Sequence, residues 1–370
     1  MTPYRISFVM EQALGHITHT HNLQEQVARD PSIAAHWALI PQNVDGLAGH
    51  IPVYKSNWTV RAGLRTRRAL AGLEHVSRPD ALFFHTQVPA VLAHNWVRRV
   101  PSIISLDATP LQYDQLGLSY SHATSAAWLE RLKWRLNRDC FASARHLITW
   151  SAWARQGLIE AYEVPADKIT VVPPGVNVNA WSRPTPRRLH DGPVKILFVG
   201  GDFRRKGGRL LLKAFRELRH LGIELHLVTR DRLIEEPGLF VYNDVQPNSH
   251  LLKQLAHDCD IFCLPTYGDC LPMVLSEAGA AGLPLVSTDV AAIPEIVRDG
   301  ENGFVVPVGS AAALADALRR LIENPALRLQ QGERAAALVR ETFDVQRNAQ
   351  QLLALLKDVA DTARPVRRAA

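Results

Sequence analysis

Two carboxylates and two adjacent cations have the residue types and the spacing that could do chemistry in this chain. Asp269 and Glu277 stand eight positions apart, and Arg205 and Lys206 follow a glycine-bearing stretch. Two carboxylates alone could do acid–base work on a glycosidic bond, whereas a cation beside the start of a helix can hold a phosphate. Together these groups predict a binding site that has both carboxylates and a phosphate-binding cation.

The two carboxylates are expected at the carboxyl end of a buried parallel strand. The apolar run 260–265 is typical of such a strand, a loop follows over 266–271, and 272–281 favours a helix. Ligands of open parallel sheets bind at the carboxyl ends of the strands, and the helix start adds free N–H groups and a partial positive charge. Asp269 and Glu277 are therefore expected to border a binding crevice.

The two cations are expected in a similar place after another strand. The run 194–200 predicts a strand, 209–221 predicts a helix, and the stretch 201–208 between them reads GDFRRKGG. N–H groups at the start of that helix and the Lys206 ammonium would hold a pyrophosphate. Arg205 is the expected second cation, and the alternative is that both residues belong to a solvated basic turn.

Strands alternate with helices through both halves of the chain. In the first half the expected strands are 5–9, 37–41, 81–85, 102–107 and 146–151. Such alternation predicts parallel sheets that are covered by helices. Because 370 residues exceed what one compact core usually serves, two domains are expected.

The stretch 269–284, DCLPMVLSEAGAAGLP, resembles the signature of the retaining, nucleotide-sugar-dependent glycosyltransferases of the family four type. That signature has two glutamates eight residues apart and Glu-Ala-x-Ala-x-Gly-x-Pro at the second. Asp269 departs from it, because the family usually has glutamate there. The segments 293–295 and 300–304 sit where the family has G-x-x-E and G-x-x-G-x-L, and 167–177 is similar to the family's K-I-x-V-I-P-x-G-V-D.

The resemblance implies the GT-B fold, an α/β architecture of two Rossmann-like domains whose parallel sheets face each other across a cleft. The expected parts are an acceptor domain at 1–179, a linker at 180–192 and a nucleotide-sugar domain at 193–343. A helix at 344–361 is expected to pack back towards the first domain, and a tail follows at 362–370.

The resemblance also implies roles for site residues. Lys206 would stabilise the departing nucleoside diphosphate. The family's arginine falls on Gly201 here, so Arg205 would supply the second positive charge. Asp269 would orient hydroxyls of the sugar, and Glu277 would accept hydrogen bonds from the ribose. The base is expected near 229–231 and 243–245. The expected donor-binding residues lie on these loops and helix starts: Gly15, Gly201, Arg205, Lys206, Thr229, Arg230, Val245, Asp269, Leu271, Met273, Val274 and Glu277.

Expectations for the acceptor side rest on strand ends of the first half. Asp107 ends a strand where many relatives place a histidine-bearing loop, so it joins Arg205, Lys206 and Asp269 as a candidate catalytic residue; the alternative is a cap of the following turn. Three histidines lie near Gly15, at 16, 19 and 21. They lack a carboxylate partner in sequence, so no metal is expected; one of them could bind acceptor or phosphate, or the group could cap a helix.

The expected activity is retaining, metal-independent transfer of a hexose from a nucleoside-diphosphate sugar to a hydroxyl of a glycan, a lipid-linked sugar or a small molecule. No cofactor is expected. A non-catalytic relative that binds a sugar nucleotide or a partner is the alternative. A two-carboxylate glycosidase would leave the basic stretch 201–208 around Lys206 unexplained. A dehydrogenase is disfavoured because no G-x-G-x-x-G follows the first strand.

Composition and charge narrow the possible partners of the protein and the compartment in which it is expected. The net charge of +6 is mild, and the clusters at 55–68 and 131–138 are expected to be solvated faces or to attract anionic lipid headgroups. No nucleic-acid-binding signature accompanies them. Four cysteines without paired spacing indicate a reducing compartment. With no signal peptide and no long apolar run recognised, the expected location is the cytoplasm, with peripheral contact to the inner face of the membrane as a further option.

Overall fold

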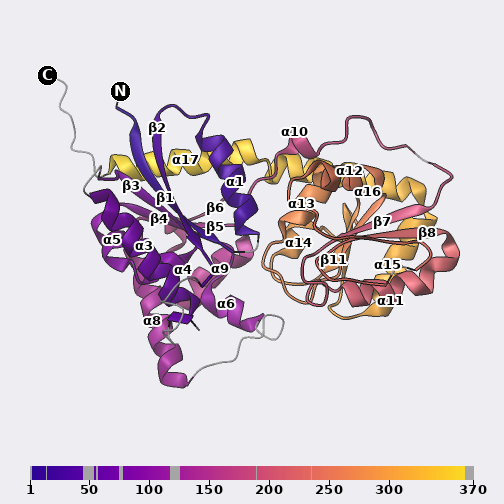
Figure 1. Cartoon of the computed structure of the whole chain (residues 1–370), viewed down its shortest axis with the longest axis horizontal. Helices are drawn as coiled ribbons and strands as arrows, with labels where there is room; N and C mark the ends of the chain where they lie inside the picture. The colour runs from indigo at the N-terminus through magenta and orange to yellow at the C-terminus, as the bar shows by residue number, and fades with distance from the viewer. Residues whose placement is uncertain are drawn as a thin grey trace. The chain divides into compact units, whose positions relative to one another are not determined.

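The computed structural model describes residues 2–362 apart from 14, 45–53, 56, 75–77, 117–125, 189 and 235, and apart from the Glu74 side chain. The chain splits into two compact units, which Figure 1 shows in their sequence colours. Unit 1 combines Met1–Gln115 and Ala123–Gly175 with Val345–Ala370, and unit 2 holds Val176–Asp344. Of the expected tail at 362–370, only Thr362 lies within the described residues.

In the described part of the chain, unit 1 is built on a six-stranded sheet with the order β2-β1-β3-β4-β5-β6, and every pairing is parallel. Its strands are β1 (Tyr4–Gln12), β2 (Ile33–Pro41), β3 (Ala81–His85), β4 (Ser102–Leu106), β5 (His146–Thr149) and β6 (Ile169–Val171). The central strands β3 and β4 are buried along their whole length. This pattern follows from helices on both faces of a parallel sheet.

The helices of unit 1 connect and cover these strands. They are α1 (His16–Val27), α3 (Trp58–Glu74), α4 (Gln87–Val91), α5 (His94–Arg99), α6 (Pro110–Gln115), α8 (Ala127–Ser143), α9 (Ala152–Tyr162), the short 3₁₀ helix η2 (Ala166–Lys168) and α17 (Val345–Asp361).

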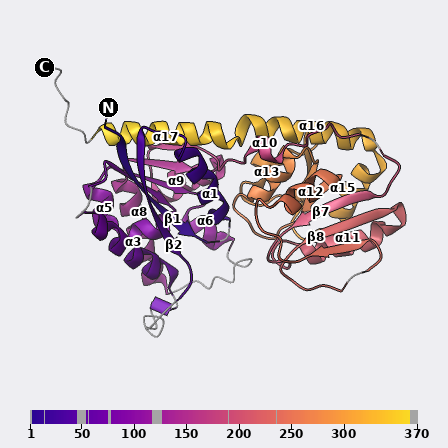
Figure 2. The ribbon, with the colours of Figure 1, turned by 45° about the horizontal axis from the view of Figure 1, so that its top comes forward.

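The last helix, α17, packs on the sheet of unit 1 beside α1 (Figure 2). Its apolar face, which includes Leu352, Leu353 and Leu356, joins the core that also holds Phe8. On its polar side, Lys357 Nζ donates to Asp30 Oδ2 over 2.7 Å. Burial of this apolar face holds the end of the chain against the first strands.

Unit 2 contains a second six-stranded parallel sheet in the described residues, with the order β12-β11-β10-β7-β8-β9. Its strands are β7 (Val194–Val199), β8 (Ile223–Val228), β9 (Leu239–Tyr242), β10 (Ile261–Leu264), β11 (Leu285–Thr288) and β12 (Gly303–Val306). The central neighbours β7 and β10 therefore bring the two stretches that follow them, 200–207 and 265–272, to the same edge of the sheet.

The helices of unit 2 alternate with these strands. They are α10 (Val178–Trp181), α11 (Gly208–Leu218), η3 (Arg219–Leu221), α12 (His250–Asp258), α13 (Met273–Ala280), α14 (Ile293–Ile296), α15 (Ala311–Glu323) and α16 (Pro325–Thr342). Apolar stripes on α11, α12 and α15 face the sheet, as their buried leucines show. This spacing of apolar residues is what a helix on a sheet requires.

Candidate active site

The lysine turn, which we define as residues 200–207 between β7 and α11, is held against the end of β10 by a close backbone contact. Gly207, at the start of α11, has a φ of 79°, and a Cβ there would lie 1.8 Å from the Pro265 carbonyl oxygen. Only glycine fits both the left-handed backbone and this contact. The turn between β7 and α11 is thereby fixed beside the loop that carries Asp269.

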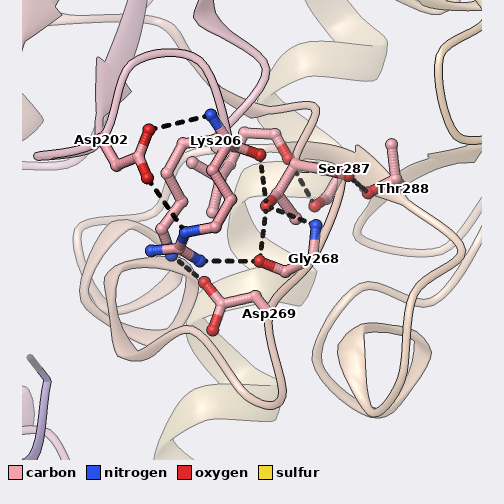
Figure 3. A network of polar contacts seen from close by, with 9 residues as sticks. Asp202, Lys206, Gly268, Asp269, Ser287 and Thr288 are labelled. Carbon is pink, nitrogen blue, oxygen red and sulfur yellow. Dashed lines mark hydrogen bonds and ion pairs between the residues drawn. The ribbon is translucent and has the colours of Figure 1, made fainter. Parts of the chain in front are cut away.

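Lys206 and Asp269 contact each other through Nζ and Oδ2 (Figure 3). Both side chains are largely enclosed, with 15% and 14% of their surface exposed. Burial, together with neighbouring Arg205, lowers the pKa of Lys206 to about 7. The Asp269 carboxylate favours the charged ammonium, and a bound anion would favour it further. The pair therefore offers an enclosed cation beside a carboxylate, and a bound anion would favour its charged form.

Arg205 joins the lysine turn to the 266–271 loop. Its guanidinium donates to Asp202 Oδ2 over 3.3 Å and to the Gly268 carbonyl oxygen over 2.8 Å, and its side chain is 12% exposed. The Arg205 carbonyl oxygen accepts from the Tyr267 N–H over 2.9 Å. Figure 3 shows these contacts around Gly268. The arginine thus orders the loop from which Asp269 projects.

Hydroxyl groups of neighbouring strands hold the other side of this loop. Thr288 Oγ1 donates to the Thr266 carbonyl oxygen and Ser287 Oγ to the Leu264 carbonyl oxygen, each over 2.7 Å. All four residues are buried. Satisfied buried polar groups of this kind favour one backbone conformation, so the Asp269 carboxylate rests on a well-braced loop.

The helix α13 contributes a buried carboxylate and an open amino end. Glu277 is 6% exposed, and its side chain makes no hydrogen bond within the described residues. Burial raises the pKa of Glu277 to about 7, and Lys253 opposes this rise. Pro272 precedes the helix without a side-chain cap. The first N–H groups of a helix have no partner inside it, so those of Met273 and Val274 can donate to a ligand.

Arg230 lies against Gly201, the position where the resembled family carries its arginine. A Cβ on Gly201 would lie 3.4 Å from Arg230 Nε and 3.6 Å from its Cζ. Arg230 is exposed and makes no side-chain hydrogen bond or ion pair in the described part of the chain. The loop is tied down on either side, since Phe203 N donates to Asp231 Oδ2 over 2.9 Å and Asn243 Nδ2 donates to the Thr229 carbonyl oxygen over 2.8 Å.

Unit 1 contains a polar cluster where its strands end. His16 Nε2 lies 3.5 Å from Asp107 Oδ2, and its Nδ1 lies 3.8 Å from Glu11 Oε2. Burial acts to lower the pKa of His16, but Asp107 and Glu11 outweigh it and the pKa is raised. The ring of His16 contacts that of His85, whose centroid is 4.6 Å away.

The other two histidines near Gly15 differ from His16. Burial and the nearby His16 lower the pKa of His19 to about 3, whereas the His21 side chain is exposed. Within the described residues no group of three or more histidines, cysteines or carboxylates is placed to hold a metal ion.

The structure thus places the expected site residues in two groups. The members on unit 2 follow the carboxyl ends of its strands: Gly201, Arg205, Lys206, Thr229, Arg230, Val245, Asp269, Leu271, Met273, Val274 and Glu277. Gly15 and Asp107 belong to unit 1. Sequence reasoning missed Asp202, which positions Arg205, and it missed the Glu11 and His85 neighbours of His16. The place of Glu11 and His85 at the ends of β1 and β3 was a signal that could have identified them.

Comparisons with known proteins agree with this arrangement. A family model described as "Glycosyltransferase Family 4" matches residues 17–180, and one described as "Glycosyl transferases group 1" matches residues 193–324. Glycogen synthase of Mycobacterium tuberculosis is 29% identical over 306 residues, which cover 78% of this chain and 70% of that protein.

Solved structures support the fold. Sucrose-phosphate synthase from Thermosynechococcus elongatus superposes with a TM-score of 0.75 at 16% identity, covering 97% of this chain and 100% of that one. HepE of Anabaena in complex with UDP-glucose gives 0.70 at 16% identity, covering 96% and 99%. The predicted α/β fold with two parallel sheets, of the GT-B type, is confirmed. The chain belongs to the group 1, or family four, glycosyltransferases, which transfer a sugar from a nucleotide sugar to an acceptor.

Proposed function

We propose that this glycosyltransferase moves a hexose from a uridine-diphosphate sugar to a hydroxyl acceptor, with retention of the anomeric configuration and without a metal. The observation that carries the proposal is the contact of Lys206 with Asp269. It joins a phosphate-binding cation to a carboxylate suited to sugar hydroxyls, at the strand edge that also bears the open start of α13. Uridine is favoured because HepE, with the same fold, binds UDP-glucose.

In this assignment each group meets one part of the donor. Lys206 and the N–H groups at the start of α13 bind the diphosphate, Asp269 accepts from hydroxyls of the sugar, and Glu277 accepts from the ribose. The bond between the sugar C1 and the phosphate oxygen breaks, and a bond from C1 to the acceptor oxygen forms on the same face. The acceptor's proton passes to the leaving phosphate oxygen. The protein supplies position and positive charge.

Arg230 is the cation that supplements Lys206 at the diphosphate. The guanidinium of Arg205 is already engaged by Asp202 and Gly268, so it acts as a positioning residue for the loop. Arg230 stands over Gly201 with its guanidinium unpaired among the described residues. A long side chain from the next strand end therefore occupies the place that the family fills from position 201.

Moving the arginine back tests this assignment. Arg230→Gln is expected to weaken UDP binding about tenfold or more, the effect of losing one charge-assisted hydrogen bond. Adding Gly201→Arg to that variant is expected to restore most of the affinity, because the new side chain reaches the same space. Calorimetric titration with UDP measures both changes. Arg232→Gln, an exposed arginine two residues away, is the matched control. Equal losses in the Arg230 and Arg232 variants would refute the assignment.

Asp107 and His16 are the candidate groups on the acceptor side. Asp107 raises the pKa of His16, so the pair can hold a proton beside an acceptor hydroxyl. His16, on α1, thus lies beside Asp107, which follows β4 at the position where many relatives have a histidine-bearing loop. Because the pair belongs to unit 1, Asp107→Asn should lower transfer to the acceptor and leave the affinity for UDP unchanged.

Turnover of donor sugars tests the proposed function against a purely binding role. Calorimetry with uridine, guanosine and adenosine diphosphates is expected to give the tightest binding for UDP. UDP-hexoses should then be hydrolysed slowly without acceptor, and proton NMR should show the α-anomeric product formed first from an α-linked donor. Binding of UDP-sugar without any hydrolysis or transfer would favour the non-catalytic alternative, and preference for another base would exclude uridine.

A further inference from the structure

Helix α8 of unit 1 carries an exposed apolar stripe. Trp128, Leu132 and Leu136 recur once per turn, with exposed fractions of 69%, 45% and 38%. Residues four apart lie on the same face of a helix, so these side chains form one continuous ridge about 12 Å long. The first turns of α8 project past the other helices of unit 1 (Figure 1).

The opposite face of α8 is already fixed to its unit. Trp134 Nε1 donates to the Ala161 carbonyl oxygen over 2.8 Å, and its ring stacks on Tyr162 with centroids 6.3 Å apart. Cys140 and Phe141 are fully buried. The exposed ridge therefore lies on the side of α8 away from these buried contacts.

Unpaired arginines border the ridge along one side. Arg131 and Arg135 are exposed and form no hydrogen bond or ion pair with the described residues, whereas Lys133 is paired with Glu130 and Arg138 with Glu163. At 100° per residue, Arg131 and Arg135 fall within a quarter turn of Trp128. Long arginine side chains can reach along an apolar surface to place their charge at an anionic boundary.

We propose that α8 docks the enzyme on an anionic lipid bilayer, with the ridge in the interface and the two arginines on the headgroup phosphates. A tryptophan, two leucines and adjacent cations on one helix face are what an interfacial helix needs. Among the described residues no helix is long and apolar enough to cross a bilayer. The inference goes beyond the proposed function and does not depend on it.

A second copy of the chain fits this face poorly. In a symmetric contact the ridge would bring Arg131 and Arg135 towards their own copies, and like charges oppose such pairing. Three side chains also offer far less area than the roughly 1,200 Å² that a stable interface buries. An anionic surface instead complements both the charge and the apolar ridge.

Site-specific labelling tests the contact directly. All four native cysteines are buried, so Leu132→Cys can be labelled selectively with an environment-sensitive fluorophore. Vesicles of equimolar phosphatidylcholine and phosphatidylglycerol that contain a brominated lipid should quench the label at position 132. The same label on Ile234→Cys in unit 2, a side chain 90% exposed, should not be quenched. Equal quenching at both positions, or none at 132, would overturn the proposal.

Cosedimentation with the same vesicles tests the role of charge. Each arginine near an anionic surface contributes about fivefold to partitioning, so Arg131→Gln with Arg135→Gln should weaken binding about 25-fold at low salt and leave UDP affinity unchanged. Arg67→Gln with Arg68→Gln removes the same charge from α3 and should weaken it much less. Equal loss of vesicle binding in both double variants would contradict docking through α8. Self-association of the wild type in sedimentation velocity, if Leu132→Glu abolishes it, would contradict the proposal as well.

Discussion

Lys206→Ala is expected to lower kcat for sugar transfer by about 10²–10³, the loss that follows removal of one preorganised group facing developing charge. Negative charge builds on the diphosphate as the bond to the sugar breaks, and Lys206 is the enclosed cation beside Asp269. Because the charge grows towards the transition state, KM for the donor should rise less than kcat falls. Initial rates at saturating and limiting donor measure the two effects.

Two further variants separate this effect from a disturbed fold. Lys213→Ala removes an exposed lysine from the helix that follows the same turn and should keep wild-type rates. Lys206→Gln keeps a donor for Asp269 but no charge, so its circular dichroism should match the wild type while kcat stays low. Near-wild-type kcat in either Lys206 variant would remove the lysine from the reaction.

Glu277→Gln is expected to weaken UDP binding by about 10- to 100-fold and to make the protein more stable at about pH 8. The ribose loses a charged acceptor, which accounts for the affinity. Stability rises because burial raises the pKa of Glu277 from 4.5 to about 7. A carboxyl whose folded pKa is raised loses stability as pH climbs from the unfolded to the folded value, by on the order of 3 kcal/mol here. Glutamine avoids that loss.

The pH dependence of thermal melting checks the sign of this expected change in stability. The melting temperature of Glu277→Gln should exceed that of the wild type by several degrees at about pH 8, and the two should converge near pH 4, where wild-type Glu277 is neutral. Glu301→Gln, on an exposed loop of the same unit, should change neither melting nor affinity. A less stable Glu277→Gln protein at high pH would show that the ionised carboxylate is held by groups in the folded state.

Strong periodic signals made most of the fold predictable. Short, largely apolar runs such as 81–85 and 260–265 match β3 and β10, because a strand buried on both faces has little besides apolar residues. The first helix begins at His16, so the three histidines lie within it and do not cap its start. Thr18, His19 and Thr20 in its first turns are polar but buried, so hydrophobic periodicity could not reveal them. Helix α8 escaped notice because its apolar positions face outward as well as inward.

The predicted site was recoverable where order along the chain dictates position. Strand–loop–helix units place Lys206 and Asp269 at one edge once β7 and β10 are neighbours, and this follows from the parallel topology. Contacts that depend on side-chain direction were not predictable. The approach of Arg230 to Gly201 joins residues on two different loops, and the engagement of Arg205 by Asp202 and Gly268 depends on how the 266–271 loop folds back.

The central claim is that Lys206 and the start of α13 hold the donor diphosphate. A crystal structure with bound UDP tests it most directly. The account predicts that the diphosphate lies within hydrogen-bonding distance of Lys206 Nζ and of the Met273 and Val274 N–H groups, with the ribose hydroxyls on Glu277. A diphosphate bound elsewhere, with these groups left without contact to the nucleotide, would contradict it.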